Sequence, residues 1–145
     1  MNLQPTQDQR YIVVDASLWV ARLVPQDASH AAVRTWMDTR RAEEIEFLAP
    51  ALLLAEVAGA VSRRTGEAGL AGRAVEYLER LPGLRLVEMD RALIDEAAHL
   101  AAELGLRGAD ATYAAVASRL GLPLATLDAD QRSPAAQRIS IHAIE

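Results

Sequence analysis

Short apolar runs alternate along this chain with longer stretches of helical periodicity, and this alternation limits the folds open to it. Apolar residues cluster in short segments that predict strands at 11–14, 46–49, 84–87, 124–127 and 139–143. Helical spacing predicts helices over 17–24, 28–42, 50–64, 70–81, 91–104 and 108–120. Strands that alternate with helices form βαβ units, so we expect an α/β fold with a central, mainly parallel sheet covered on both faces.

Capping residues define the ends of several predicted helices. Asp90 is placed to cap the helix that begins at Arg91, and Gly105 to end it. Gly121 ends the following helix in the same way. Pro50 fits the first turn of a helix, where its missing N–H is not needed, so we expect that helix to begin there.

Length and composition indicate one globular unit. The chain has 145 residues, of which 51% are hydrophobic, and we expect a single domain over 1–145 with a flexible polar extension at 1–10. It contains no cysteine, which excludes thiolate metal sites, thiol nucleophiles and disulfides. It also lacks a signal-peptide core and any run approaching the roughly 18 apolar residues of a membrane span. We therefore expect a soluble cytoplasmic protein without membrane contact.

Four acidic residues stand where a charge is costly or where a ligand binds. Asp15 and Asp128 each end an apolar strand, and ligands of open α/β sheets bind beyond such ends. Glu56 lies in an apolar helix with no Lys or Arg within one turn to pair with it. Asp110 lies in the first turn of an otherwise apolar helix. Structural alternatives stay open for all four: helix caps, a solvent-facing Glu, or a turn residue.

These carboxylates have a shared chemistry if they converge at one edge of the sheet. Carboxylates brought within a few ångströms repel one another and retain protons unless a cation joins them. Oxygen-only ligation selects hard cations such as Mg²⁺ or Mn²⁺. Such ions activate water and stabilise the charge of a phosphoryl displacement.

Four segments of the chain together resemble the signature motifs of the PIN-domain family. They are Val13-Val14-Asp15-Ala16-Ser17, Leu54-Ala55-Glu56-Val57, Gly108-Ala109-Asp110-Ala111-Thr112-Tyr113-Ala114 and Ala125-Thr126-Leu127-Asp128. Their order and spacing both fit, the resemblance spans about 11–144, and it is closest to the VapC-like toxins of type II toxin–antitoxin pairs. Each motif is short, so the assignment rests on all four occurring in order.

The resemblance implies a three-layer α/β/α sandwich and an endoribonuclease that uses Mg²⁺ or Mn²⁺. Asp15, Glu56, Asp110 and Asp128 match the acidic quartet that holds the metal in this family. Ser17 matches a small hydroxyl residue beside the first Asp, as an auxiliary or as a helix-start residue. The implied partners are RNA, a small antitoxin protein and a second copy of the chain.

Two features of the sequence depart from a simple RNA-binding pattern. The net charge is −5, whereas phosphate binding usually rests on basic surface. All 15 basic residues are Arg, and the candidates for phosphate contacts are Arg63, Arg64, Arg107 and Arg132, or else solvated surface residues. The segment after Asp128 is not diagnostic and leaves open whether Asp130 shares in the site.

Two other functions compete with the ribonuclease. A phosphatase with an aspartyl nucleophile requires a second acid two residues after the first, and Ser17 occupies that position. A catalytically silent module of the same fold that binds RNA or protein would not need all four acids. The three His residues show no paired ligand spacing, and Trp19 and Trp36 lie on helical stripes typical of a core.

Overall fold

The computed structural model describes residues 10–144, so nearly all of the predicted N-terminal extension at 1–10 lies outside the described residues. A four-stranded, all-parallel sheet with the order β3-β2-β1-β4 forms the centre. The strands are β1 (Tyr11–Val14), β2 (Glu46–Pro50), β3 (Leu84–Val87) and β4 (Leu124–Ala125). The helices are α2 (Ala16–Leu23), α3 (His30–Ala42), α4 (Leu53–Thr65), α5 (Ala68–Arg80), α6 (Arg91–Leu104), α7 (Gly108–Leu120) and α8 (Ala129–Ala135).

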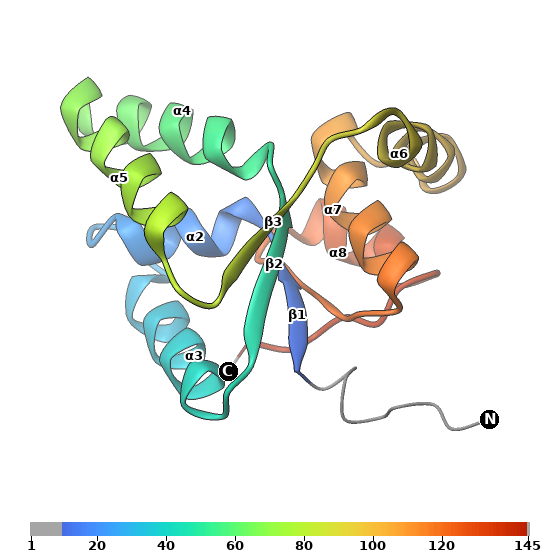
Figure 1. The fold of residues 1–145 in the computed structure, drawn as a ribbon, viewed down its shortest axis with the longest axis horizontal. Coiled ribbons are helices and arrows are strands. Elements are labelled where there is room, and N and C mark those ends of the chain that lie inside the picture. The colour runs from blue at the N-terminus through green and yellow to red at the C-terminus, as the bar shows by residue number, and fades with distance from the viewer. Residues whose placement is uncertain (1–9, 145) are drawn as a thin grey trace.

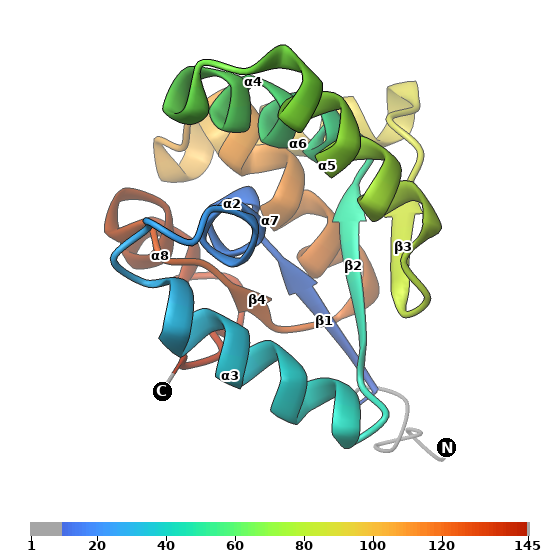
Figure 2. The same ribbon diagram turned by 90° about the vertical axis from the view of Figure 1, so that its left-hand side faces the viewer.

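Helices cover both faces of this sheet (Figures 1 and 2). Figure 1 shows α2, α3, α4 and α5 on one side of the strands and α6, α7 and α8 on the other. On the first side α4 packs on α5 and α2, and on the second side α7 packs on α6 and against β1, β2 and β4. The predicted three-layer α/β/α sandwich is therefore confirmed.

The core is built around the central strand and one buried helix. Val13 of β1 is fully buried and pairs with Leu48 on one side and Leu124 on the other. In α7 every residue from 111 to 117 is buried, and four of these seven residues are Ala. Small side chains let this helix approach the sheet closely, so its rotation and position are fixed by packing on all sides.

Three predicted strand or helix ends were wrong, and contacts with residues distant in the sequence account for them. Pro50 ends β2 instead of opening a helix, and it pairs with Val87 of β3. The strand predicted to reach Leu127 stops after Ala125, because the N–H of Leu127 donates to the Ser17 hydroxyl instead of to a neighbouring strand.

The strand predicted at 139–143 is reduced to a single parallel bridge between Ile141 and Leu124. The backbone on either side of this bridge is still bonded to β4, because Leu124 donates to the Ser140 carbonyl and His142 donates to the Leu124 carbonyl, both at 2.9 Å. The His142 side chain packs edge-on against Trp36 of α3, with 5.3 Å between ring centroids.

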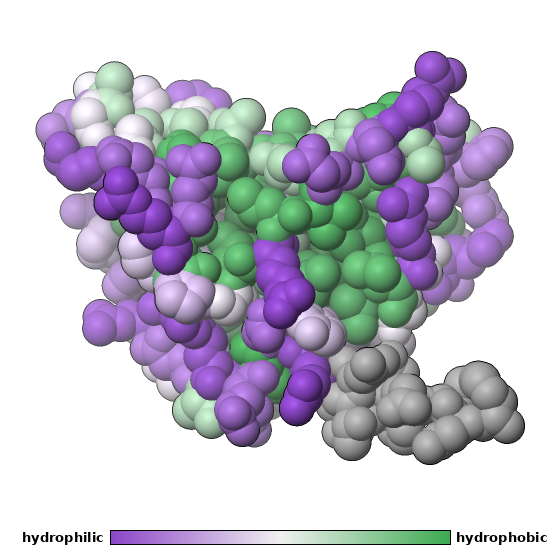
Figure 3. Space-filling view, viewed as in Figure 1, coloured by the Kyte–Doolittle hydropathy of each residue, from purple (hydrophilic) through white to green (hydrophobic). Residues whose placement is uncertain are grey.

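The edge strand β3 leaves apolar side chains partly open to solvent. Figure 3 shows a hydrophobic area over the middle of this face, bordered by hydrophilic side chains. Leu84, Leu86 and Val87 of β3 are only partly buried, because β3 pairs with β2 on one side alone. Among the described residues, no helix combines the length and apolarity needed to cross a membrane.

The start of α6 provides a test of the fold that does not involve the four acids. The Asp90 carboxylate accepts a hydrogen bond from the N–H of Leu93 at 2.9 Å. Asp90→Ala removes this cap and is expected to lower the free energy of unfolding by about 1 kcal/mol, measured by urea denaturation. Asp90→Asn keeps an acceptor and is expected to remain close to wild type; equal losses in both variants would contradict the capping role.

Candidate functional site

All four predicted acids lie at or just before the start of a helix. Asp15 follows β1 and is the N-cap of α2, and Asp128 is the N-cap of α8. Glu56 lies in the first turn of α4, which β2 leads into, and Asp110 in the first turn of α7. Positive helix-dipole ends therefore surround the site, which favours negative charge there.

Asp15 is almost fully buried, with 5% of its surface exposed. Its Oδ2 atom accepts hydrogen bonds from the N–H of Ser17 and from the hydroxyl of Thr126, both at 3.1 Å. Burial raises the pKa of Asp15, and the bonds from Ser17 and Thr126 offset only part of that increase. A charged Asp15 therefore lacks a full set of compensating partners within the protein.

Glu56 is held by a buried phenol. The hydroxyl of Tyr113, a fully buried residue of α7, donates to Glu56 Oε1 at 2.7 Å. Burial and the charge of Asp15 raise the pKa of Glu56, whereas the bond from Tyr113 lowers it. Burial and the Glu56 charge in turn raise the pKa of Tyr113, so this phenol stays protonated and acts as a donor. Tyr113 thus both packs in the core and orients the carboxylate.

Asp110 lies within electrostatic reach of each of the other three acids. Burial and the negative charges of Asp15, Asp128 and Glu56 raise the pKa of Asp110 to about 6, against the weaker effect of Arg107. Four carboxylates from distant parts of the chain therefore act on one region. The three neighbours destabilise a fully ionised site in the absence of a cation.

A buried polar network, which the sequence analysis did not identify, links these acids. Thr126 and Gln131 are 1% and 0% exposed. The Thr126 hydroxyl lies 3.1 Å from Asp15 Oδ2 and 3.0 Å from Gln131 Oε1, and it accepts from the N–H of Asp128 at 3.0 Å. The Gln131 amide donates to the backbone carbonyl of Asp110 at 3.2 Å.

One sequence signal would have located the start of α8, although not the network itself. An acid followed three residues later by Gln, as in Asp128 and Gln131, is typical of a helix start. The Asp128 carboxylate does cap α8, accepting from the N–H of Asp130 at 2.9 Å. The Gln131 side chain, however, turns into the core instead of back to the cap.

The two auxiliary candidates, Ser17 and Asp130, have different surroundings. The Ser17 hydroxyl accepts from the N–H of Leu127 at 3.0 Å and so ties the start of α2 to the end of β4. The Asp130 side chain is 82% exposed and lies 3.8 Å from Arg107. Ser17 is thus part of the framework around Asp15, whereas Asp130 belongs to the solvent-facing rim.

Two of the arginines proposed as phosphate contacts, Arg107 and Arg64, lie in different surroundings. Arg107 precedes α7, its side chain is 76% exposed, and its charge acts on Asp110. Arg64 instead forms an ion pair with Asp27 at 2.7 Å, in the loop between α2 and α3. Of these two, only Arg107 is placed beside the acids.

The chemistry of the donors fits a hard divalent cation. All four are carboxylates, the ligand type that Mg²⁺ and Mn²⁺ prefer. Within residues 10–144, however, no three acidic or histidine side chains lie close enough together to form a complete ligand set. An ion bound here would therefore take its remaining ligands from water, as Mg²⁺ commonly does.

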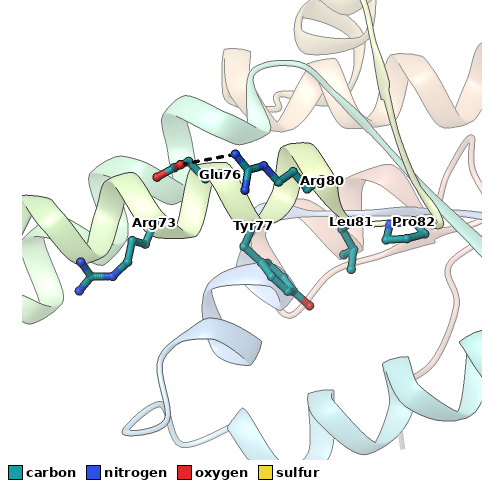
Figure 4. Close-up of a pocket in the computed structure, with 6 residues that line it drawn as sticks. All are labelled: Arg73, Glu76, Tyr77, Arg80, Leu81 and Pro82. Atoms are coloured by element: carbon teal, nitrogen blue, oxygen red, sulfur yellow. Dashed lines mark ion pairs between the residues drawn. The ribbon is translucent and has the colours of Figure 1, made fainter.

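A hollow along α5 lies apart from the four acids. Figure 4 shows it, a space of about 510 Å³ along α5 lined by Arg73, Glu76, Tyr77, Arg80, Leu81 and Pro82. Arg80 lies 4.0 Å from Glu76 across its wall, and none of the four predicted acids lines it. This hollow is therefore separate from the candidate metal site.

Solved structures with the same fold span nearly the whole chain. VapC20 of Mycobacterium tuberculosis, described as a toxin that cleaves the sarcin–ricin loop, matches with a TM-score of 0.75 and 21% identity over 91% of this chain and 99% of its own. VapBC2 of Rickettsia felis, bound to a promoter DNA fragment, matches with a TM-score of 0.70 and 11% identity, over 93% of this chain and 99% of its own. FitAcB of Neisseria gonorrhoeae matches with a TM-score of 0.64 and 23% identity, over 91% of this chain and 96% of its own.

A comparison with curated proteins gave no match. The family model described as "PIN domain", in contrast, matches residues 12–137, a range that includes all four predicted acids, Thr126 and Gln131. The match covers well over half of the chain, and the chain therefore belongs to the PIN-domain family.

Proposed function

We propose that this protein is a metal-dependent endoribonuclease, the toxin of a type II toxin–antitoxin pair. The observation that carries the proposal is the buried carboxylate of Asp15, which is 5% exposed and which, with Asp128 and Glu56, lies near enough to Asp110 to raise its pKa. Acids that perturb one another in this way are a signature of functional sites. Membership in the PIN-domain family and the shared fold with VapC20, a toxin described as cleaving the sarcin–ricin loop, support a nuclease activity.

In this proposal Asp15, Glu56, Asp110 and Asp128 hold Mg²⁺ or Mn²⁺. When bound, the ion supplies Lewis-acid stabilisation of the phosphate and a more acidic water molecule. The protein's own contribution is orientation. The N–H of Ser17 and the Thr126 hydroxyl fix Asp15, and the Tyr113 hydroxyl fixes Glu56. Fixed oxygens lower the reorganisation required when the ion and the substrate bind.

RNA binding in an acidic protein requires a local source of positive charge. Arg107 is exposed beside Asp110, and its contact with Asp130 is long and open to water, so the guanidinium is available to a phosphate. We propose Arg107 as a phosphate contact next to the cleavage site. Because it is Arg and not Lys, it can bind two phosphate oxygens at once.

The proposed protein partners are an antitoxin and a second copy of the chain. Two of the solved structures that share the fold are VapBC2 and FitAcB. VapBC2 is bound to a DNA fragment from its promoter. The partly exposed apolar side chains along β3 support association with another protein surface, because burying them removes apolar area from water.

The first test replaces the most buried acid without removing its cap. Asn is as good an N-cap as Asp, so Asp15→Asn is expected to fold but to lose roughly 100-fold or more of the Mg²⁺- or Mn²⁺-dependent RNA cleavage rate. Asp90→Asn is the matched control, since it makes the same change at the cap of α6. RNA cleavage that resists EDTA, or that survives in Asp15→Asn, would contradict the proposal; metal binding without any cleavage would favour the binding module.

A second test uses the electrostatic cost of the metal-free site. The folded protein holds the Asp110 proton with a pKa of about 6, against 3.8 for an unperturbed Asp. This proton stabilises the fold below about pH 4, and the contribution is lost as the pH rises through 6.

Asp110→Asn removes the charge, so without metal it is expected to raise the free energy of unfolding at pH 7 by roughly 1 kcal/mol and by much less at pH 4. Because Asp110 is partly exposed, water screens its charge, and the gain is smaller than the pKa shift alone would give. Thermal unfolding at the two pH values measures it. Mn²⁺ is expected to stabilise wild type but not the variant, and a variant less stable than wild type at pH 7 would count against mutual repulsion among the acids.

A further inference from the structure

Gln131 is a neutral polar side chain that is fully buried among the candidate metal ligands. It lies in the first turns of α8, and none of its surface is exposed. Its amide N–H donates to the Asp110 carbonyl at 3.2 Å, and its Oε1 lies 3.0 Å from the Thr126 hydroxyl. Burying an amide is costly unless both ends are bonded, and an apolar side chain would fill this space without that cost.

The two partners of Gln131 carry different parts of the site. The Asp110 carbonyl belongs to the first turn of α7, the segment that places the Asp110 carboxylate. Thr126 follows β4 and donates from the same hydroxyl to Asp15 Oδ2 at 3.1 Å. The Gln131 amide therefore connects the backbone that carries Asp110 with the hydroxyl that binds Asp15. It bonds directly to the Asp110 carbonyl, 21 residues earlier in the sequence, and reaches Asp15 through Thr126.

Thr126 has one hydroxyl proton and two acceptors within reach, Asp15 Oδ2 and Gln131 Oε1. The proton is shared between them, while the hydroxyl oxygen accepts from the N–H of Asp128. Three of the four candidate ligands thus meet in one network through Thr126 and Gln131. A shift of α7 relative to α8 would break the hydrogen bond from Gln131 to the Asp110 carbonyl.

We propose that Gln131 is a positioning residue that sets the separation of Asp15 and Asp110, and thereby the affinity of the site for a divalent cation. The inference rests on the proposed function, because it assigns Gln131 to the metal site of that function. Gln131 touches neither ion nor substrate; it acts by fixing the start of α7 against the end of β4. Residues that orient metal ligands in this way typically contribute 10–100-fold to affinity or activity.

The test compares Mn²⁺ affinity in wild type and Gln131→Met. Met has similar length and no branching, it removes both hydrogen bonds, and it leaves the Thr126 hydroxyl with Asp15 as an acceptor. The variant is expected to fold, while its Mn²⁺ dissociation constant, measured by calorimetry and by thermal stabilisation, rises about tenfold or more. RNA cleavage falls in parallel and recovers partly at saturating Mn²⁺, which a purely structural defect would not produce.

Val33→Ala is the control for general destabilisation. Val33 is fully buried in α3, which carries none of the four acids, so its truncation lowers stability without touching the network. This control is expected to keep wild-type Mn²⁺ affinity. If Gln131→Met does not fold, Gln131→Asn replaces it, because the shorter amide cannot reach both partners and is expected to weaken Mn²⁺ binding in the same way.

The outcomes separate this inference from the function on which it rests. Wild type that binds no Mn²⁺ overturns the proposed function and this inference with it. Wild type that binds Mn²⁺ while the folded Gln131 variant binds equally well overturns the inference alone. A variant weakened no more than Val33→Ala at matched stability also overturns it. Weakened binding in the Gln131 variant with unchanged binding in the control supports the positioning role.

Discussion

The structure depends on a buried negative charge at the end of its central strand. Asp15 is 5% exposed, caps α2, and receives only two hydrogen bonds at its Oδ2 atom. A carboxylate in such a place is stable only if donors or a cation compensate its charge. The charges of Glu56, Asp110 and Asp128 in the same region add to the repulsion instead of relieving it. The proposed divalent cation would offset this repulsion.

The fold delivers this arrangement through parallel strands and one buried helix. Parallel strands place their carboxyl ends at one edge, so Asp15 after β1 and Asp128 after β4 come to the same side of the sheet. Helix α7 is buried over 111–117, and Tyr113 in this run reaches Glu56 of α4 from the other layer. Apolar packing thus fixes the position of the acids, while polar contacts fix their orientation.

The sequence was sufficient where the signal is local. The predicted limits of α6 and α7 match the structure, because Asp90, Gly105 and Gly121 act as caps there and both glycines adopt positive φ. Strand ends were less predictable, since they depend on partners. β4 stops at Ala125 because the Leu127 amide finds Ser17, a residue 110 positions away in the sequence.

The residues of the candidate site were also predictable where the signal is local, and not where it depends on tertiary partners. Strand ends and two apolar helices singled out the four acids from 20 acidic residues, and in the structure the charges of Asp15, Asp128 and Glu56 all act on Asp110. Thr126 and Gln131 were not identified, because a buried polar residue is recognised only once its tertiary partners are known. Their role as a link between ligands has no periodic or local pattern in the chain.

A crystal of the protein grown or soaked with Mn²⁺ tests the central claim most directly. The account predicts an anomalous difference peak between the carboxylates of Asp15, Glu56, Asp110 and Asp128, at the metal–oxygen distances of a partly hydrated ion. The account is contradicted if a crystal saturated with Mn²⁺ shows no peak there, or if its Glu56 side chain points away from Asp15 and Asp110.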